Sequence, residues 1–442
     1  MSILKLFQPI ASAFAPNYTI VDVLIAWKYV FLPWKWGKLQ EDESFKTPHT
    51  PLLGGGRNFR KLERKFCEYM EARWAVSFDS GRSGLYAILK CMGIKDYDEV
   101  ILQAFTTVAL PNAILWCGAK PIYIDIKEKT YNIDPEKIEE KITEKTRAIV
   151  VQHTFGNPAD MDEIMEIAKK HDLFVIEDCA HSLGAEYKNK KTGTFGDAAF
   201  FSFGRDKVIS SVAGGMVITN NGELSKKIKE FRDQMPYPEK SLIIRQLLHP
   251  VITFMALKSY YFLGIGKILM FLATNSGILT KAYGRKEKNN EKPDNFPAKM
   301  TNALAEIALH QFNMLSRFNE HRINIANIYN DELKNIDGIT VPETLQGSKN
   351  IFLWYTILAE DKSSVISHAK KEHIILGDWF PKAIGPIETD LKRSGYDVGS
   401  CPVAENVSSK CINLPTNRNT DHDDAFKIIR FIREQSKIHN PE

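Results

Sequence analysis

The chain of 442 residues lacks several features that would assign it to common protein classes. Its six cysteines form no CxxC pair and no cluster with metal-ligand spacing, so we expect reduced thiols and no metal site. Lys and Arg exceed Asp and Glu by only four, so the charge does not indicate nucleic acid as a partner. The N-terminus lacks the basic region, apolar block and cleavage site of a signal peptide, and we expect a cytoplasmic protein.

The sequence also contains no internal repeat and no long apolar run. Residues 241–280 are very apolar, but they are interrupted by charged residues. Their longest uncharged stretch, Ile268–Thr280, is too short to cross a bilayer as a helix.

What the chain does contain is an alternation of helix-like and strand-like segments from residue 57 to about 235. Short apolar runs between amphipathic stretches are typical of a mostly parallel sheet covered by helices on both faces. We expect strands at residues 74–78, 99–102, 121–124, 148–151, 173–178, 198–203 and 215–219. Residues 340–442 predict a smaller α/β domain, with strands at 352–355 and 412–414.

Polar side chains follow two of these strands in an informative order. Asp178 ends one strand, His181 follows it, Ser202 lies near the end of another, and Lys207 comes five residues later. Taken singly, each has an ordinary explanation as a turn residue, a half-buried histidine or a solvated lysine. Together they lie where open α/β sheets bind ligands, outside the carboxyl ends of the strands. A lysine for an imine and an acid beside a pyridine nitrogen predict pyridoxal 5'-phosphate (PLP) as the cofactor.

Longer blocks around these residues resemble the DegT/DnrJ/StrS family of PLP-dependent sugar aminotransferases, which have the aspartate aminotransferase (fold type I) architecture. The resemblance covers roughly residues 50–235 and 295–435. Its blocks are Asp98–Ile101, His153–Met161, Glu177–His181, Gly184–Ala185, Phe201–Lys207, Gly214–Gly215 and Leu414–Pro415. It implies an α/β protein with a three-layer PLP-transferase fold, a mostly parallel central sheet and a smaller C-terminal α/β domain.

We divide the chain accordingly. An aromatic-rich N-terminal extension (residues 1–50) precedes a large PLP-binding domain (51–235). An apolar and then charged insertion (236–294) separates that domain from a dimer helix and the small C-terminal domain (295–442).

The resemblance implies a role for each site residue. Lys207 would be the catalytic residue, binding PLP through an imine and later moving a proton. Asp178 would pair with the pyridine nitrogen, and His181 would lie near the ring and its phenolic oxygen. Ser202 would bind the phosphate.

The segment Gly81, Arg82 and Ser83 sits where the family has a turn that receives the phosphate on the N–H groups of a helix N-terminus. Arg82 either adds a charge-assisted bond to the phosphate or points to solvent, and both alternatives stay open.

The implied reaction moves an amino group from an amino acid, usually glutamate, to a nucleotide-linked keto-sugar for cell-surface glycan biosynthesis. Members of the family with His in place of the lysine act as dehydratases, and Lys207 argues against that branch. The resemblance further implies a homodimer with its sites at the subunit interface.

The sequence departs from the family pattern at three places. Thr107 occupies the position of an aromatic residue over the PLP ring, so either Phe105 supplies a ring or stacking is lost; we keep Thr107 among the expected cofactor contacts. Pro297 and Lys299 replace the Asn and Arg of an Asn-Tyr-Arg-Met motif, which puts a cross-subunit phosphate contact in doubt. Residues 1–50 and 236–294 are additions.

The additions allow two interpretations. Residues 24–38 and 241–280 interleave aromatic and aliphatic residues with lysine, a pattern that suits peripheral docking on a membrane, here the inner face. Alternatively, the two segments pack on each other or extend the dimer interface.

A hypothesis of another class is a non-catalytic relative that binds PLP or a sugar and acts as a regulator or scaffold of a membrane glycan-assembly complex. The missing stacking residue and the altered segment 295–300 favour it, whereas the intact set Lys207, Asp178 and Ser202 argues against it.

Overall fold

The computed structural model describes residues 8–11, 17–31 and 58–439. Residues 32–50 of the predicted N-terminal extension, and with them residues 32–38 of its aromatic stretch, therefore lie outside the described residues.

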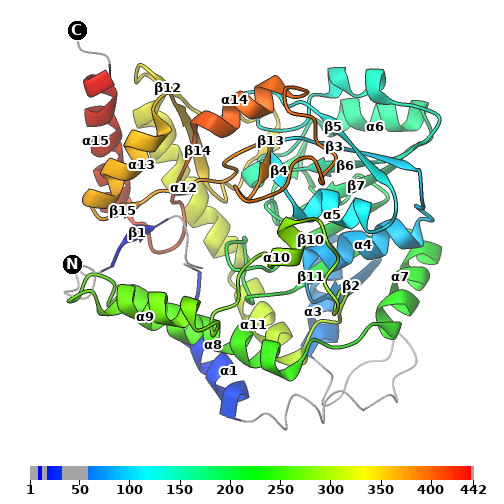
Figure 1. The fold of residues 1–442 in the computed structure, drawn as a ribbon, viewed down its shortest axis with the longest axis horizontal. Coiled ribbons are helices and arrows are strands. Elements are labelled where there is room, and N and C mark those ends of the chain that lie inside the picture. Colours follow the sequence, from blue (N-terminus) through cyan, green and yellow to red (C-terminus); the bar gives the residue numbers. More distant parts are fainter. Residues whose placement is uncertain (1–7, 12–16, 32–57, 440–442) are drawn as a thin grey trace.

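A seven-stranded sheet forms the centre of the large domain (Figure 1). Its strands, in spatial order, are β2 (Trp74–Phe78), β11 (Gly215–Thr219), β10 (Ala198–Ser202), β7 (Phe174–Asp178), β6 (Thr146–Gln152), β3 (Glu99–Gln103) and β5 (Lys120–Ile124). Only β11 runs antiparallel to its neighbours, and the other adjacent pairs are parallel. The predicted, mostly parallel sheet is therefore confirmed.

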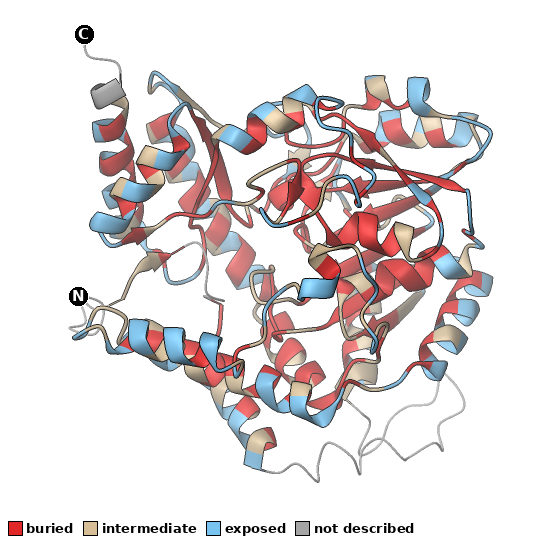
Figure 2. Ribbon diagram, viewed as in Figure 1, coloured by how far each residue is buried: buried red, intermediate tan, exposed pale blue. Residues whose placement is uncertain are grey.

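Helices cover both faces of this sheet, because successive residues of the strands are apolar. Along β3, Val100 and Leu102 belong to the main core cluster, whereas Ile101 belongs to a second cluster that contains residues of α6. Figure 2 shows the strands buried on both sides. The helices of this domain are α3 (Asn58–Met70), α4 (Gly81–Cys91), α5 (Ala109–Leu115), α6 (Met161–Lys170) and α7 (Gly222–Gln234).

The small domain is built on a three-stranded antiparallel sheet with its own core. The strands are β12 (Ile339–Thr340), β14 (Tyr355–Ala359) and β17 (Cys411–Leu414), and the surrounding helices are α12 (Leu315–Leu333), α13 (Lys362–Lys371), α14 (Pro402–Lys410) and α15 (His422–His439). The strand predicted at 352–355 was wrong in its start, since only Tyr355 belongs to β14. Phe352 has a positive φ of 48°, and the Leu353 N–H donates to the Phe155 carbonyl of the large domain.

Short strand pairs join distant parts of the chain. They are β1 (Ile10–Ala11) with β15 (Ile374–Ile375), β4 (Thr106–Thr107) with β16 (Ile384–Gly385), and β8 (Glu186–Tyr187) with β9 (Lys190–Lys191) and β13 (Ser348–Lys349). The pair β4–β16 ties Thr107 to the small domain.

The region between the two domains is helical. It consists of α8 (Lys240–Lys258), α9 (Ile265–Asn275) and the short α10 (Arg285–Lys288), and α11 (Asn302–Phe312) follows it. The N-terminal helix α1 (Ile20–Phe31) packs on α8 and α11, as Figure 1 shows at the lower left. The described helix of the N-terminal addition thus packs on the second addition. No helix among the described residues combines the length and apolar character needed to span a membrane.

Candidate active site

A cavity of about 280 Å³ lies at the carboxyl ends of β7 and β10 and the N-terminus of α4. Seven of the eight site residues named from the sequence line it, namely Gly81, Arg82, Thr107, Asp178, His181, Ser202 and Lys207. Ser83 does not line the cavity. It lies behind the wall, where its hydroxyl is 3.1 Å from the Ser80 hydroxyl.

Lys207 is half-buried beside His181, with 2.8 Å between Nζ and Nε2. Burial lowers the pKa of Lys207 to about 8, against the opposing charges of Asp178 and Asp206. Burial also holds the pKa of His181 well below its usual range, so the imidazole is neutral. Its Nδ1 accepts the Phe155 N–H at 3.4 Å, which leaves the ring proton on Nε2. That proton is donated to Nζ when the lysine is neutral, as imine formation requires.

The His181 ring is held by aromatic neighbours. It stacks on Phe155 at 5.7 Å and on Phe380 at 6.1 Å between ring centroids, and it meets the edge of Trp354 at 5.5 Å. The histidine therefore has one orientation, fixed by packing rather than by charge.

Asp178 ends β7 as a buried carboxylate. Burial raises its pKa to about 6, whereas the Ala180 N–H bond, Lys207 and His153 lower it. The Ala180 N–H donates to Oδ1 at 2.9 Å. A cation placed in this cavity would favour the ionised carboxylate, and a protonated pyridine nitrogen is such a cation.

The N-terminus of α4 and the end of β10 form the opposite wall. Ser80 caps the helix by accepting the Ser83 N–H on its side chain at 3.2 Å. A Cβ on Gly81 would lie 3.2 Å from the Ser202 Cβ and 3.3 Å from the Phe201 carbonyl oxygen, so helix and strand are in close contact. The first N–H groups of a helix have no intrahelical acceptor, and together with the Ser202 hydroxyl they suit a phosphate group.

Arg82 does not point to solvent. It forms an ion pair with Glu287, and its guanidinium carbon lies 5.3 Å from the centre of the Tyr283 ring. The Glu287 carboxylate also accepts the Gly284 N–H at 2.6 Å, which fixes the segment that carries Tyr283. A contact from Arg82 to a phosphate stays a prediction.

Thr107 contacts an aromatic residue that the sequence did not point to. The Tyr283 hydroxyl donates to the Thr107 hydroxyl oxygen at 2.8 Å, and the Ala109 N–H donates to the same oxygen at 3.0 Å. Phe105 does not line the cavity, because it is fully buried against Phe155 and Phe380. Further lining residues that the sequence reasoning missed are Asp79, Arg205, Gln246, Thr280, Glu287 and Trp379.

The altered segment 295–300 is used within the chain. Neither Pro297 nor Lys299 lines the cavity, and the Lys299 Nζ donates to the Asp233 carbonyl at 2.8 Å. The cross-subunit contact therefore stays an open prediction.

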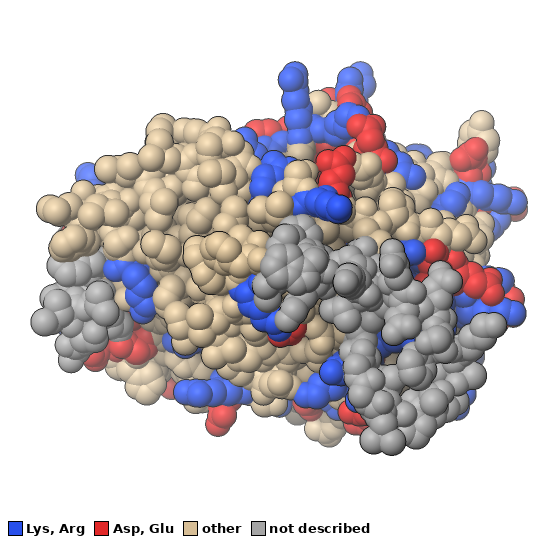
Figure 3. All heavy atoms as spheres, turned by 90° about the horizontal axis from the view of Figure 1, so that it is seen from below, with Lys and Arg blue, Asp and Glu red and all other residues tan. Residues whose placement is uncertain are grey.

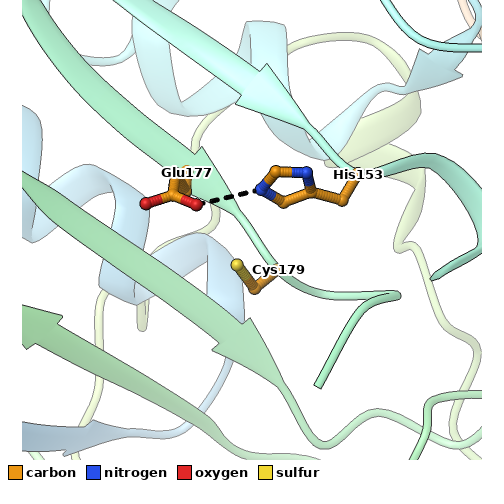
Figure 4. A group of neighbouring side chains, drawn as sticks. All are labelled: His153, Glu177 and Cys179. Carbon is orange, nitrogen blue, oxygen red and sulfur yellow. Dashed lines mark hydrogen bonds and ion pairs between the residues drawn. The ribbon is translucent and has the colours of Figure 1, made fainter. Parts of the chain in front are cut away.

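One group of metal-capable side chains occurs in the described part of the chain, made of His153, Glu177 and Cys179 (Figure 4). Its ligand atoms already have partners. Glu177 accepts the N–H groups of Gly193, Phe195 and Gly196 and bonds His153 Nε2 at 3.0 Å. His153 Nδ1 accepts the Ala159 N–H at 3.0 Å. This buried network ties the end of β7 to its neighbouring loops.

Comparison with known proteins identifies the family. Residues 47–240 and 270–433 match the model of the DegT/DnrJ/EryC1/StrS aminotransferase family. The chain belongs to this family. The match omits residues 241–269, which are most of α8 and the start of α9.

Individual relatives of this DegT-family chain match along almost their whole length. An uncharacterised protein of Methanocaldococcus jannaschii is 34% identical, with 90% of this chain and 95% of the relative covered. The GDP-perosamine synthase of Escherichia coli O157:H7 is 30% identical, with 92% and 97% covered. A putative sugar aminotransferase of Streptococcus pneumoniae, solved in its PMP form, is 20% identical, with 98% of this chain and 97% of that chain covered. The two structures superpose with a TM-score of 0.72, which shows that they share the fold.

The cavity of this DegT-family enzyme fits its cofactor, PLP. It offers a half-buried amine of lowered pKa, a buried carboxylate, and a helix N-terminus beside a serine hydroxyl. These groups match an aldehyde, a pyridine nitrogen and a phosphate, respectively.

Proposed function

We propose that this chain transfers the amino group of an amino acid, glutamate by preference, to a keto-sugar linked to a nucleotide. The products are the 2-oxo acid of the donor and the amino sugar, so the nitrogen is conserved. The observation that carries the proposal is the half-buried Lys207, which has a lowered pKa and lies 2.8 Å from His181 in one cavity with Asp178 and Ser202. Nucleotide linkage is supported by the 30% identical GDP-perosamine synthase.

PLP, when bound, supplies an electron sink for the negative charge that develops on the amino-bearing carbon of the substrate. Lys207 would hold the cofactor covalently through Nζ; once the donor's amino group has displaced it, the free Nζ would take a proton from the substrate carbon and return it. His181 orients Nζ through the bond from Nε2–H. Asp178 would keep a positive charge on the pyridine nitrogen, and the α4 N-terminus with Ser202 would bind the phosphate.

The visible absorbance of the purified protein with PLP tests this proposal. The wild type should show a band that glutamate bleaches, and Lys207→Ala should show neither the band nor its bleaching. A band in the wild type that no amino donor changes would support the non-catalytic hypothesis, which the comparisons do not favour. A protein without any Lys207-dependent band would exclude the PLP assignment.

The division at residues 50, 235 and 294 and the homodimer are part of the same proposal and rest on the family resemblance. A dimer is checked by the mass in solution, which should be twice the 50.3 kDa of the chain. A monomeric mass for the active enzyme would contradict it.

We also propose that this cytoplasmic enzyme docks on the inner face of the membrane. Helix α1 bonds α11 through polar side chains, since the buried Asp22 bonds His310 at 2.6 Å and the exposed Lys28 bonds Glu306 at 2.8 Å. Large apolar residues of α1, α8, α9 and the connection between α8 and α9 are left exposed, among them Leu24, Trp27, Phe31, Met255, Leu263, Ile268, Phe271 and Leu272. We call these residues the apolar face; Figure 3 views the molecule from this side. Exposed apolar surface of this extent is unusual for a free protein.

Charge favours a lipid surface over a second copy as the occupant. Residues 240–281 contain five cations and no Asp or Glu; the cations are Lys240, Arg245, Lys258, Lys267 and Lys281. Two copies meeting by this face would bring like charges together, whereas anionic lipid headgroups would neutralise them.

Flotation with vesicles tests the docking. The wild type should float with vesicles containing phosphatidylglycerol and less with neutral ones, and the double variant Leu263→Glu/Phe271→Glu should stay in the soluble fraction. Val398→Glu, at an exposed apolar residue outside the face, is the matched control. A double variant that changes the mass in solution while floating normally would assign the face to contact between copies instead.

A further inference from the structure

Several buried polar groups meet beside Lys207 without satisfying each other. Arg205 and Gln246 both line the cavity, the second from α8. Gln246 is 8% exposed, yet its Oε1 has no hydrogen-bond partner among the described residues, and the same holds for Arg205 Nε. His249, one turn further along α8 and 5% exposed, has an unpartnered Nδ1. Buried polar atoms are rarely left in this state unless a ligand or water completes them.

Arg205 is a half-buried cation whose charge the neighbouring Asp206 offsets only in part. Its Nη2 bonds the Thr280 hydroxyl, which also lines the cavity, and no ion pair to an acid is formed among the described residues. Burial lowers its pKa, whereas Tyr18 and Asp206 raise it, so its charge is only partly compensated. Burial and the nearby Arg205 charge lower the pKa of His249 to about 3, so His249 adds no second cation. An anion bound here would remove the cost of the half-buried guanidinium.

We propose that Arg205, together with Thr280 and Gln246, forms the subsite for the amino-acid donor, in which Arg205 binds the donor's carboxylate. The inference rests on the proposed transamination. Arg205 lies two residues before Lys207, so their Cα atoms are at most about 7 Å apart. The donor's amino nitrogen must come to the reactive end of Lys207, and its carboxylate is attached to the same carbon as that nitrogen. A guanidinium is the side chain best suited to bind a carboxylate with two bonds.

Gln246 gives this subsite a second function in the reaction. Its unpartnered amide oxygen accepts a hydrogen bond, so it suits the ammonium or amine group of the donor rather than the carboxylate. Because Gln246 lies within residues 241–269, which the family model omits, this donor subsite is built partly from a segment outside the family match.

The test separates donor binding from cofactor binding. The concentration of glutamate that half-bleaches the PLP band is measured for wild type, Arg205→Gln, Arg205→Lys and Gln246→Leu, together with the dissociation constant of PLP. Arg205→Gln should raise the glutamate concentration about ten- to a hundredfold while PLP affinity changes less than about twofold. Arg205→Lys should restore part of the loss. The bleaching rate at saturating glutamate should fall much less than the affinity.

Arg147→Gln provides the control for loss of one arginine charge, since Arg147 pairs with Asp98 away from the cavity. The melting temperature of each PLP-free variant shows whether it is folded. Unchanged glutamate dependence in folded Arg205→Gln overturns the inference, and so does weakened PLP binding with unchanged glutamate dependence, which would place Arg205 at the phosphate. Absence of any Lys207-dependent band in the wild type would instead refute the proposed function itself.

Discussion

The state of Lys207 before the cofactor arrives yields a quantitative prediction. Only the neutral amine attacks the PLP aldehyde, and burial lowers the pKa of Lys207 from 10.5 to about 8. At pH 7 about one lysine in ten is then neutral, against about one in 3,000 for an unperturbed lysine, a gain of about 300-fold. We therefore expect the rate of PLP capture to rise about tenfold per pH unit up to about pH 8 and then to level off.

Stopped-flow absorbance on the PLP-free protein between pH 6 and 10 measures this profile, and the reaction of PLP with a free amine corrects for the cofactor's own titration. Asp178 raises the pKa of Lys207, so Asp178→Asn should move the midpoint to lower pH. Lys281→Met, which removes another lysine of the cavity wall, should leave the pH midpoint of PLP capture unchanged. A capture rate that keeps rising tenfold per unit beyond pH 9.5 would refute the argument from burial.

Three further predictions concern the cavity walls and the buried network. Tyr283→Ala should weaken PLP binding about tenfold, whereas Tyr283→Phe, which loses only the hydrogen bond to Thr107, should weaken it less than about fivefold. Equilibrium dialysis measures both affinities. Variants that bind PLP as tightly as the wild type would exclude Tyr283 from the cofactor site. Gly81→Val should abolish PLP binding because its side chain would meet Ser202, and visible circular dichroism of added PLP would reveal retained binding if this is wrong. Glu177→Gln should destabilise the fold by about 2 kcal/mol in thermal melts, because its amide donor would face backbone N–H groups that the carboxylate accepts. A chelator should leave the melting temperature of the wild type unchanged.

The sequence was most informative where function depends on short motifs. Asp178, His181, Ser202 and Lys207 were named from their order after apolar runs, because the ends of parallel strands meet at one edge of a sheet. The strands themselves were predictable to within a residue or two, since both faces of the sheet are buried and each strand is a continuous apolar run.

Contacts between distant segments were not predictable in the same way. Tyr283 bonds Thr107 across 176 residues, and no spacing rule joins two such positions. The ion pair of Arg82 with Glu287 is of the same kind, and it decided that Arg82 is not a solvent-exposed residue. Residues 352–354 were mistaken for a strand because they are apolar, although the Phe352 N–H donates to the Asn350 side chain and the Leu353 N–H to the Phe155 carbonyl rather than to a sheet.

The adjacent acids at the end of β7 have unequal freedom. Side chains alternate along a strand, so Glu177 and Asp178 face opposite sides of the sheet. Glu177 is held by three N–H groups and His153, which fixes the register of the strand end and with it the position of Asp178. The order of the two acids therefore determines which of them faces the cavity, although both carry the same charge. Exchanging them would keep composition and net charge, but it would put a longer acid into the cavity and remove the anchor that positions it.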